Sequence, residues 1–104
     1  MTEIKVYFLK FGLPIKYKGD THRGKPHGWG KGFYRDNRMY EGEWKYGKQD
    51  GFGRFYYENG ELWYEGAWKN GKREGQGKSY YNNGQVAFEG IWKQGKPCKP
   101  AKNK

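Results

Sequence analysis

Residues capable of metal, nucleophilic or acid-base chemistry are few in this 104-residue sequence, and their spacing suits none of these reactions. His22 and His27 are the only histidines, and no cysteine stands near them to complete a metal site. The single cysteine, Cys98, excludes an internal disulfide. No Ser/His/Asp order or Cys/His pair suits nucleophilic catalysis. We therefore expect no enzyme activity, no metal and no cofactor.

Carboxylates and glycine pairs have simpler interpretations than catalysis. Glutamates recur at Glu41, Glu43, Glu65 and Glu89. Paired carboxylates act as acid and base only in a pocket that separates their pKa values, so we interpret them as ion-pair partners of Lys or Arg on neighbouring strands. Gly51-x-Gly53 is not followed by a helix pattern, which a phosphate-binding loop requires.

The composition is basic and aromatic, with a net charge of +10 and aromatic residues making up 20% of the chain. Leu, Ile and Val together number only eight, so aromatic rings must supply most of the buried surface. The N-terminal stretch has no apolar run of signal-peptide length, and no window is apolar enough to span a membrane. We expect a soluble, cytoplasmic protein.

An internal repeat organises the chain. The pattern Tyr40-x-Gly42-x-Trp44 recurs at the same step as Tyr64-x-Gly66-x-Trp68 and again as Phe88-x-Gly90-x-Trp92. A weaker copy begins with Tyr17-x-Gly19, and its step to the next copy is shorter by one position. Residues at i, i+2 and i+4 share one face of a strand. Each unit therefore reads as a β-hairpin.

Turn residues predict the register of these hairpins. Asn59-Gly60 and Asn83-Gly84 are typical of two-residue type I′ turns. The first of these turns would pair Phe55 with Tyr64, Gly53 with Gly66 and Gly51 with Trp68. For the other loop we predict Tyr40 opposite Tyr57, Gly42 opposite Phe55 and Trp44 opposite Gly53. The shorter first step requires a three-residue turn, which we place at 36–38.

The repeated segments resemble the MORN (membrane occupation and recognition nexus) repeat family. The matching segments are YEGEWKYGKQDGFG from Tyr40, YEGAWKNGKREGQG from Tyr64, FEGIWKQGK from Phe88 and, more faintly, YKGDTHRGKPHGWG from Tyr17, where Thr21 replaces the usual Trp. The resemblance implies an all-β protein with no long helix, in which successive hairpins form one elongated, curved antiparallel sheet. It also implies an aromatic groove on the concave face and a non-catalytic module that binds proteins or acidic phospholipids.

The expected organisation is a single hairpin array over residues 1–96. It comprises a capping strand within 1–16, units at 17–39, 40–63 and 64–87, and a partial unit at 88–96. Stacked units of this kind fold cooperatively because each unit alone buries too little surface. The remaining residues, 97–104, are basic and expected to be disordered.

The aromatic face is the predicted partner-binding site, because exposed Tyr and Trp are typical of binding hot spots. Its residues are Tyr40, Trp44, Phe55, Tyr57, Tyr64, Trp68, Tyr81, Phe88 and Trp92, and we expect them to be partly exposed. Such a module would serve as an adaptor, or as an inhibitor that occludes its target. Phe52, Tyr56, Trp63 and Tyr80 are predicted on the opposite face, where a second copy would bury them in a homodimer.

The uneven distribution of charge keeps a second interpretation open. Residues 1–35 carry a net charge of +6, residues 36–92 carry −1 and residues 93–104 carry +5. Cations alternate with rings in the first unit, where the predicted basic patch is Lys16, Lys18, Arg23, Lys25, Lys31 and Arg35. An acidic phospholipid, a nucleic acid or a nucleotide is the alternative partner.

Overall fold

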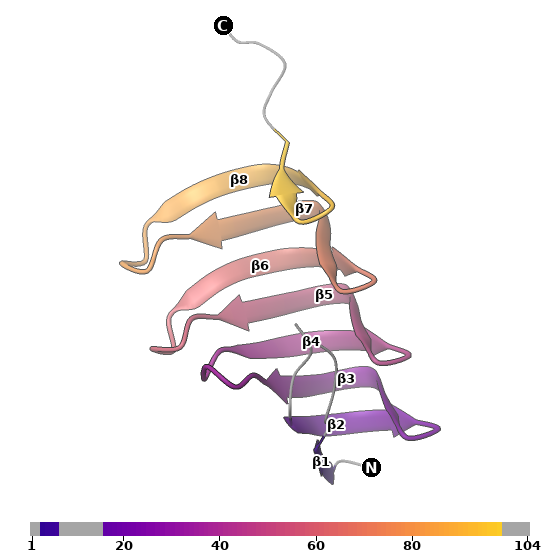
Figure 1. Ribbon diagram of the computed structural model, residues 1–104. Coiled ribbons are helices and arrows are strands. Elements are labelled where there is room, and N and C mark those ends of the chain that lie inside the picture. The colour runs from indigo at the N-terminus through magenta and orange to yellow at the C-terminus, as the bar shows by residue number, and fades with distance from the viewer. Residues whose placement is uncertain (1–2, 7–15, 99–104) are drawn as a thin grey trace, which may run out of the picture.

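The computed structural model, which describes residues 3–6 and 16–98, is a single antiparallel sheet whose nine strands lie in sequence order (Figure 1). The strands are β1 (Glu3–Val6), β2 (Lys16–His22), β3 (Lys25–Phe33), β4 (Met39–Lys45), β5 (Lys48–Tyr56), β6 (Leu62–Lys69), β7 (Lys72–Tyr80), β8 (Val86–Lys93) and β9 (Lys96–Pro97). The described ranges contain no helix, and hence none of membrane-spanning length. The predicted all-β hairpin sheet is confirmed.

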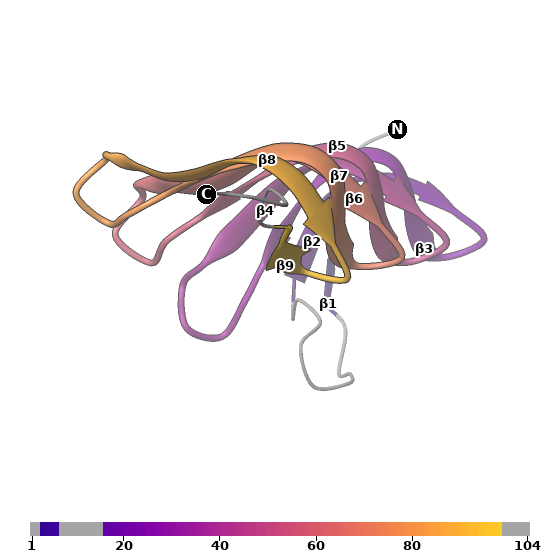
Figure 2. The ribbon, with the colours of Figure 1, turned by 90° about the horizontal axis from the view of Figure 1, so that it is seen from above.

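The sheet is elongated, and its strands bend into an arch when they are viewed along the array (Figure 2). Its extents are 49 × 26 × 23 Å. At the N-terminal edge, β1 pairs with β2 as the capping strand was expected to do. The rest of that predicted strand lies outside the described residues, as does the tail from residue 99 onward. Strand pairing continues past the expected start of the tail, because Pro97 pairs with Trp92 and the Cys98 N–H donates to the Ile91 carbonyl at 2.8 Å.

The two-residue turns lie at the opposite ends of the strands from those predicted. They are Arg23-Gly24, Tyr46-Gly47, Asn70-Gly71 and Gln94-Gly95, and both residues of each turn have positive φ. Positive φ at both positions is the type I′ geometry that matches the twist of paired strands. Only one of the four turns begins with Asn, so the residue types of the other three gave no type I′ turn signal in the sequence.

The Asn-Gly pairs instead belong to three-residue loops. The Tyr57 N–H donates to the Glu61 carbonyl at 2.8 Å, and the Gly60 N–H donates back to the Tyr57 carbonyl at 2.9 Å. Gly60 has a φ of +91°, whereas Asn59 does not have a positive φ. The loop between Tyr34 and Arg38 has the same bonds and places Asn37 at φ +73°. A three-residue turn is therefore present there, but it spans 35–37 and not 36–38.

One inserted residue explains the two repeat lengths. In β6, Trp63 has no partner, because Tyr56 pairs with Leu62 while Phe55 pairs with Tyr64. Ala87 occupies the same place in β8. The pairing of β3 with β4 has no such bulge, which makes the first unit shorter than the others by that one position. Beyond the bulge, the pairs predicted for β5 and β6 are confirmed.

The register predicted between β4 and β5 is wrong. Tyr40 pairs with Phe55, Gly42 with Gly53, and Trp44 with Gln49, rather than with Tyr57, Phe55 and Gly53. The two-residue turn and an irregularity that sets residues 50–52 opposite Glu43 together shift the pairing. As a result, glycines face glycines across strands β2 to β8: Gly19, Gly30, Gly42, Gly53, Gly66, Gly77 and Gly90.

Tyrosine rings cover this glycine ladder and form the core. Tyr17, Tyr40 and Tyr64 are 0% exposed, and their rings lie where a Cβ on Gly30, Gly53 or Gly77 would stand. Their hydroxyls donate to the carbonyls of Asp20, Glu43 and Ala67 at 2.6, 2.9 and 2.8 Å. The bare backbone of glycine is what allows each ring to lie against the sheet.

Tryptophan rings join each unit to the next. Trp44 packs edge-on against Tyr17 at 5.2 Å and against Tyr40 at 5.1 Å between ring centroids. Trp68 and Trp92 repeat this contact with the tyrosines beside them. Edge-to-face pairs of this kind contribute about 0.5–1.5 kcal/mol each beyond burial. The core is therefore continuous along the array rather than divided among the hairpins.

Replacing a covered glycine tests this arrangement. Gly53→Ala should lower the free energy of unfolding by about 3 kcal/mol or more, because its Cβ overlaps the buried Tyr40 ring. Gly60→Ala is the matched control: it meets nothing within 4 Å and carries only the cost of a φ of +91°, about 1 kcal/mol. Urea unfolding curves measure both, and equal losses would contradict the ring-over-glycine core.

The turn assignment is tested by exchanging residues at equivalent positions. Arg23 and Asn70 both begin type I′ turns, with φ of 53° and 49°. Arg23→Asn should raise the unfolding free energy by about 0.5–1 kcal/mol, and Asn70→Arg should lower it by a similar amount. Thermal unfolding midpoints should move in opposite directions. A shift in the same direction for both variants would refute the assignment.

Candidate functional site

A groove on the concave side of the arch is the candidate binding site. Arg38 reaches it from the loop between β3 and β4, and Gly95 reaches it from the turn between β8 and β9 at the other ends of the strands. Both ends bend toward the same side (Figure 2), so residues from both can meet only inside the arch. Its volume is about 380 Å³. We call this site the inner groove.

Four aromatic rings form the apolar part of the inner groove: Tyr34, Phe55, Trp63 and Trp68. The ring centroid of Phe55 lies 5.2 Å from that of Tyr34 and 5.0 Å from that of Trp63. Trp63 was predicted on the opposite face, and this prediction is wrong. The bulge at Trp63 breaks the alternation of side chains and turns the indole inward.

Cations complete the lining. Arg38, Lys72, Arg73 and Lys96 line the groove, and none of its described lining residues is acidic. The Arg38 guanidinium carbon lies 5.6 Å from the Phe55 ring centroid, and that of Arg73 lies 4.7 Å from the centroids of both Trp63 and Trp92. Arg stacks on aromatic faces through cation-π attraction. The groove is therefore a positively charged aromatic site.

The buried side-chain amide of Gln49 holds Tyr34 in place in the inner groove. Gln49 is 3% exposed, and its Nε2 donates to the Tyr34 hydroxyl at 2.6 Å. Burial raises the pKa of Tyr34 to about 12, so this hydroxyl remains protonated at physiological pH. The pair positions the ring that contacts Phe55.

Most of the predicted partner-binding residues form the core instead of an open surface. Expected partial exposure is wrong for six of them, which are at most 7% exposed: Tyr40, Trp44, Phe55, Tyr64, Trp68 and Trp92. The interlocking of neighbouring units is the reason. Of the nine predicted residues, only Phe55 and Trp68 line the inner groove.

The other three predicted residues lie near the loops or the last strand. Tyr57 is half-buried, and its hydroxyl donates to the Tyr80 carbonyl at 2.7 Å. Phe88 is half-buried in β8. Tyr81 is 57% exposed where a three-residue loop begins. Whether these three contact a partner stays a prediction.

The six residues of the basic patch are all exposed, but they do not form one cluster. Lys18 and Lys31 face each other across β2 and β3 and line a shallow depression with Trp29, and Lys16 lies along the same face. Arg23 and Lys25 are at the turn at one end of the hairpin, and Arg35 is in the loop at the other end.

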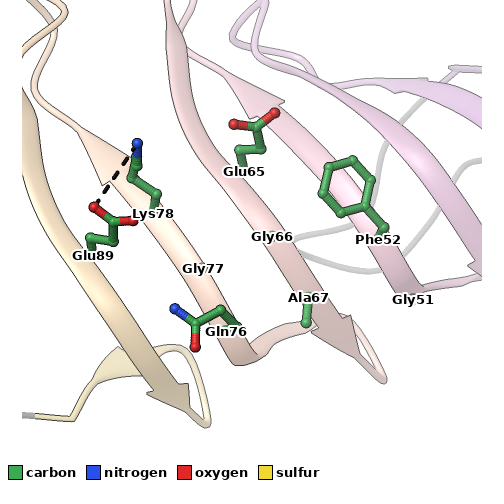
Figure 3. A pocket seen from close by; sticks show the side chains of 9 residues that line it. All are labelled: Gly51, Phe52, Glu65, Gly66, Ala67, Gln76, Gly77, Lys78 and Glu89. Atoms are coloured by element: carbon green, nitrogen blue, oxygen red, sulfur yellow. Dashed lines mark ion pairs between the residues drawn. The ribbon is translucent and has the colours of Figure 1, made fainter.

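The outer, convex face carries ion pairs and a second hollow (Figure 3). Arg54 pairs with Glu65 at 2.8 Å and Lys78 with Glu89 at 4.0 Å, which confirms the ion-pair interpretation for those two glutamates. Glu43 instead accepts the Phe52 N–H at 2.9 Å. Of the residues predicted here, Phe52 does line the hollow and is 39% exposed.

His27 has a structural role. Its Nδ1 accepts the Tyr46 N–H at 3.1 Å, and at equivalent positions Asp50 accepts from Asn70 and Glu74 from Gln94, at 3.1 and 2.9 Å. Each bond ties one hairpin to the turn of the next. Within residues 3–6 and 16–98 there is no group of three His, Cys, Asp or Glu able to hold a metal.

The groove residues that sequence reasoning missed include Tyr34, Arg38, Gln49 and Arg73. Tyr34 begins its loop as Tyr57 and Tyr81 begin theirs, but the shorter first unit concealed this equivalence. Arg73 stands where the preceding unit has Gln49, because both pair with the Trp of the opposite strand. A change of residue type at an equivalent repeat position was the available signal.

The stacked hairpins, shared aromatic core and repeated turns define a β-hairpin repeat protein. The MORN repeat family model matches residues 40–61, 64–86 and 88–98, more than half of the chain, so the chain belongs to the MORN repeat family. Members are generally binding or scaffold modules and typically non-catalytic. The hairpin of β2 and β3 lies outside the matched residues but has the same turn and ring arrangement. Comparison with curated proteins gives no significant match.

Buried tyrosines make the free energy of unfolding fall at alkaline pH. Burial raises the pKa of Tyr64 to about 12 from an ordinary value of 10.0. Above pH 10 the unfolded chain loses this proton while the folded chain keeps it, so stability is full below pH 10 and falls as the pH rises. Each such tyrosine contributes a slope of about 1.4 kcal/mol per pH unit.

Removing the Tyr64 hydroxyl should flatten this dependence. Between pH 10 and 12, Tyr64→Phe is expected to reduce the steepness with which the unfolding free energy falls by about 1.4 kcal/mol per pH unit. Phe fits at this position, since Phe88 is its equivalent in β8. Tyr46→Phe is the control, because it removes the same hydroxyl from a side chain that is 61% exposed. Identical slopes in all three proteins would contradict the prediction.

Proposed function

We propose that this chain is a non-enzymatic binding module that receives a segment of a partner protein in the inner groove. The supporting observation is the groove itself, in which Trp63, Phe55 and Arg73 meet in about 380 Å³. Trp and Arg that are partly enclosed at the centre of a site are the residue types that dominate binding energy. A module of this kind acts as an adaptor, or as an inhibitor that occludes the surface it captures.

The groove is built on rigid elements, which favours binding over catalysis. Phe55 and Arg73 lie within strands β5 and β7, and Trp63 is held between Phe55 and Arg73. Rigid side chains lose little conformational entropy when a ligand binds. The groove hydroxyl, on Tyr34, has a raised pKa because of its burial, which does not suit it to proton transfer at physiological pH.

A polyanion is the alternative partner, and it would use another surface. Lys18 and Lys31 are adjacent on the outer face, where they line a depression with Trp29. Contacts with several phosphates weaken steeply between about 50 and 200 mM salt. Binding through enclosed rings depends on salt much less, so ionic strength separates the two functions.

Substitution of Trp63 tests the proposed function. Dodecamer peptides selected from a random display library on the folded chain serve as probes, with affinity followed by Trp fluorescence. Trp63→Ala should weaken binding about tenfold or more, a loss of at least ~1.4 kcal/mol. Trp29→Ala, which removes an indole that is 44% exposed on the outer face, should leave the affinity unchanged.

Two results would refute the proposal. One is a peptide affinity that falls with Trp29→Ala, or with charge reversal at Lys18, but not with Trp63→Ala. The other is a library that yields no binder to a chain shown to be folded by its near-UV circular dichroism. Steep salt dependence together with loss of binding on Lys18 reversal would establish the polyanion alternative.

A further inference from the structure

We infer that the partner segment taken by the inner groove is acidic, and that one of its carboxylates pairs with Arg73. The inference rests on the proposed function, because it specifies the occupant of the same groove. Its basis is an enclosed guanidinium that has aromatic neighbours but no counter-ion among the described residues.

Arg73 is held in a fixed orientation between two indoles. Its guanidinium carbon lies 4.7 Å from the ring centroids of both Trp63 and Trp92, and Nη2 donates to the Gly95 carbonyl at 2.8 Å. A planar guanidinium offers five N–H donors in a rigid fork. One hydrogen bond leaves most of these donors available to a ligand.

Arg73 has no carboxylate partner of the kind that Arg38 and Arg54 have. Arg38 pairs with Asp36 and Arg54 pairs with Glu65, each at 2.8 Å. No carboxylate of residues 16–98 lies within 4.0 Å of Arg73. Burial lowers the pKa of Arg73, which reflects the cost of removing the charge from water. A ligand carboxylate would offset that cost.

The repeat architecture does not require a cation at this position. On the strand that follows each tryptophan, the residues that pair with Trp44, Trp68 and Trp92 are Gln49, Arg73 and Pro97. Gln49 satisfies its amide within the protein by donating to the Tyr34 hydroxyl. The fold therefore accepts a neutral side chain at this repeat position, and the core does not require the charge of Arg73.

The rest of the groove favours an acidic peptide over an extended polyanion. Its other charged lining residues are Arg38, Lys72 and Lys96, so the local field is positive. The groove volume of about 380 Å³ suits a few side chains of a peptide. Phe55 and Trp63 offer contacts to an apolar side chain of that peptide. A nucleic acid requires a row of cations that follows its phosphates, whereas Lys18 and Lys31 lie on the outer face.

Peptide selection on matched variants tests the inference. A random dodecamer library is selected in parallel on the wild-type chain, on Arg73→Gln and on Arg54→Gln, which removes the same charge from the outer face. We expect Asp and Glu to be enriched at least twofold over the library on wild type and Arg54→Gln, and to fall to the library level on Arg73→Gln. A wild-type-selected peptide should bind Arg73→Gln about tenfold more weakly.

The controls separate the charge of Arg73 from its packing and from the net charge. Arg73→Met keeps an unbranched side chain between the two indoles, and it should lose the acidic preference as Arg73→Gln does. It also decides the question if Arg73→Gln does not fold. Equal acidic enrichment on all variants would arise from the net charge of +10 and would overturn the inference.

The remaining outcomes distinguish this inference from the proposed function. Peptides that show no acidic preference, but lose binding with Trp63→Ala, would overturn the inference and leave the proposed function standing. A folded chain that selects no peptide would overturn both. Binding of phosphatidylserine vesicles or single-stranded DNA that depends on Arg73, with no peptide competing for it, would also overturn the inference.

Discussion

A phenol ring packed over a cross-strand glycine is the interaction on which this structure depends. Aliphatic residues are too few to form a core, so Tyr17, Tyr40 and Tyr64 form it, each 0% exposed. Any side chain at the glycines beneath them would occupy the space of the ring. A tryptophan of the next hairpin must then close over each tyrosine. Burial in one unit therefore requires its neighbour, which couples folding along the array.

Because the repeated rings are used in the core, the inner groove, which is the proposed binding surface, comes from places where the repeat is broken. Trp63 is an inserted residue that the bulge turns inward. Tyr34 and Arg38 flank the loop of the one repeat junction that has no bulge, and they approach Phe55 from there. Arg73 replaces a neutral residue at an equivalent position. The inner groove is thus lined by the irregular positions of the repeat, whereas the core is formed by its regular positions.

The sequence predicted the regular features and missed the irregular ones, for physical reasons. Tyr-x-Gly-x-Trp spacing identified the sheet, the shared face and the pairing of Gly53 with Gly66. The prediction of a two-residue turn at Asn59-Gly60 was wrong, because Asn and Gly also suit a three-residue loop in which only Gly60 needs a positive φ. An inserted residue reverses the face of its side chain, so Trp63 was placed on the wrong side. In the sequence, the inserted residue is indicated only by the shorter length of the first unit. That difference in length does not show which strand carries the bulge.

The position that Phe55 occupies explains why the inner groove forms at one place and not along the whole array. Gly32, Phe55 and Ser79 stand opposite Tyr40, Tyr64 and Phe88, the aromatic residues that open the repeated pattern in β4, β6 and β8. Only Phe55 presents a ring there, and it contacts Tyr34 on one side and Trp63 on the other. Gly32 and Ser79 are buried and too small to reach such partners. A single ring at the centre of the array therefore positions the inner groove, which we propose receives one anchoring side chain and its acidic neighbour.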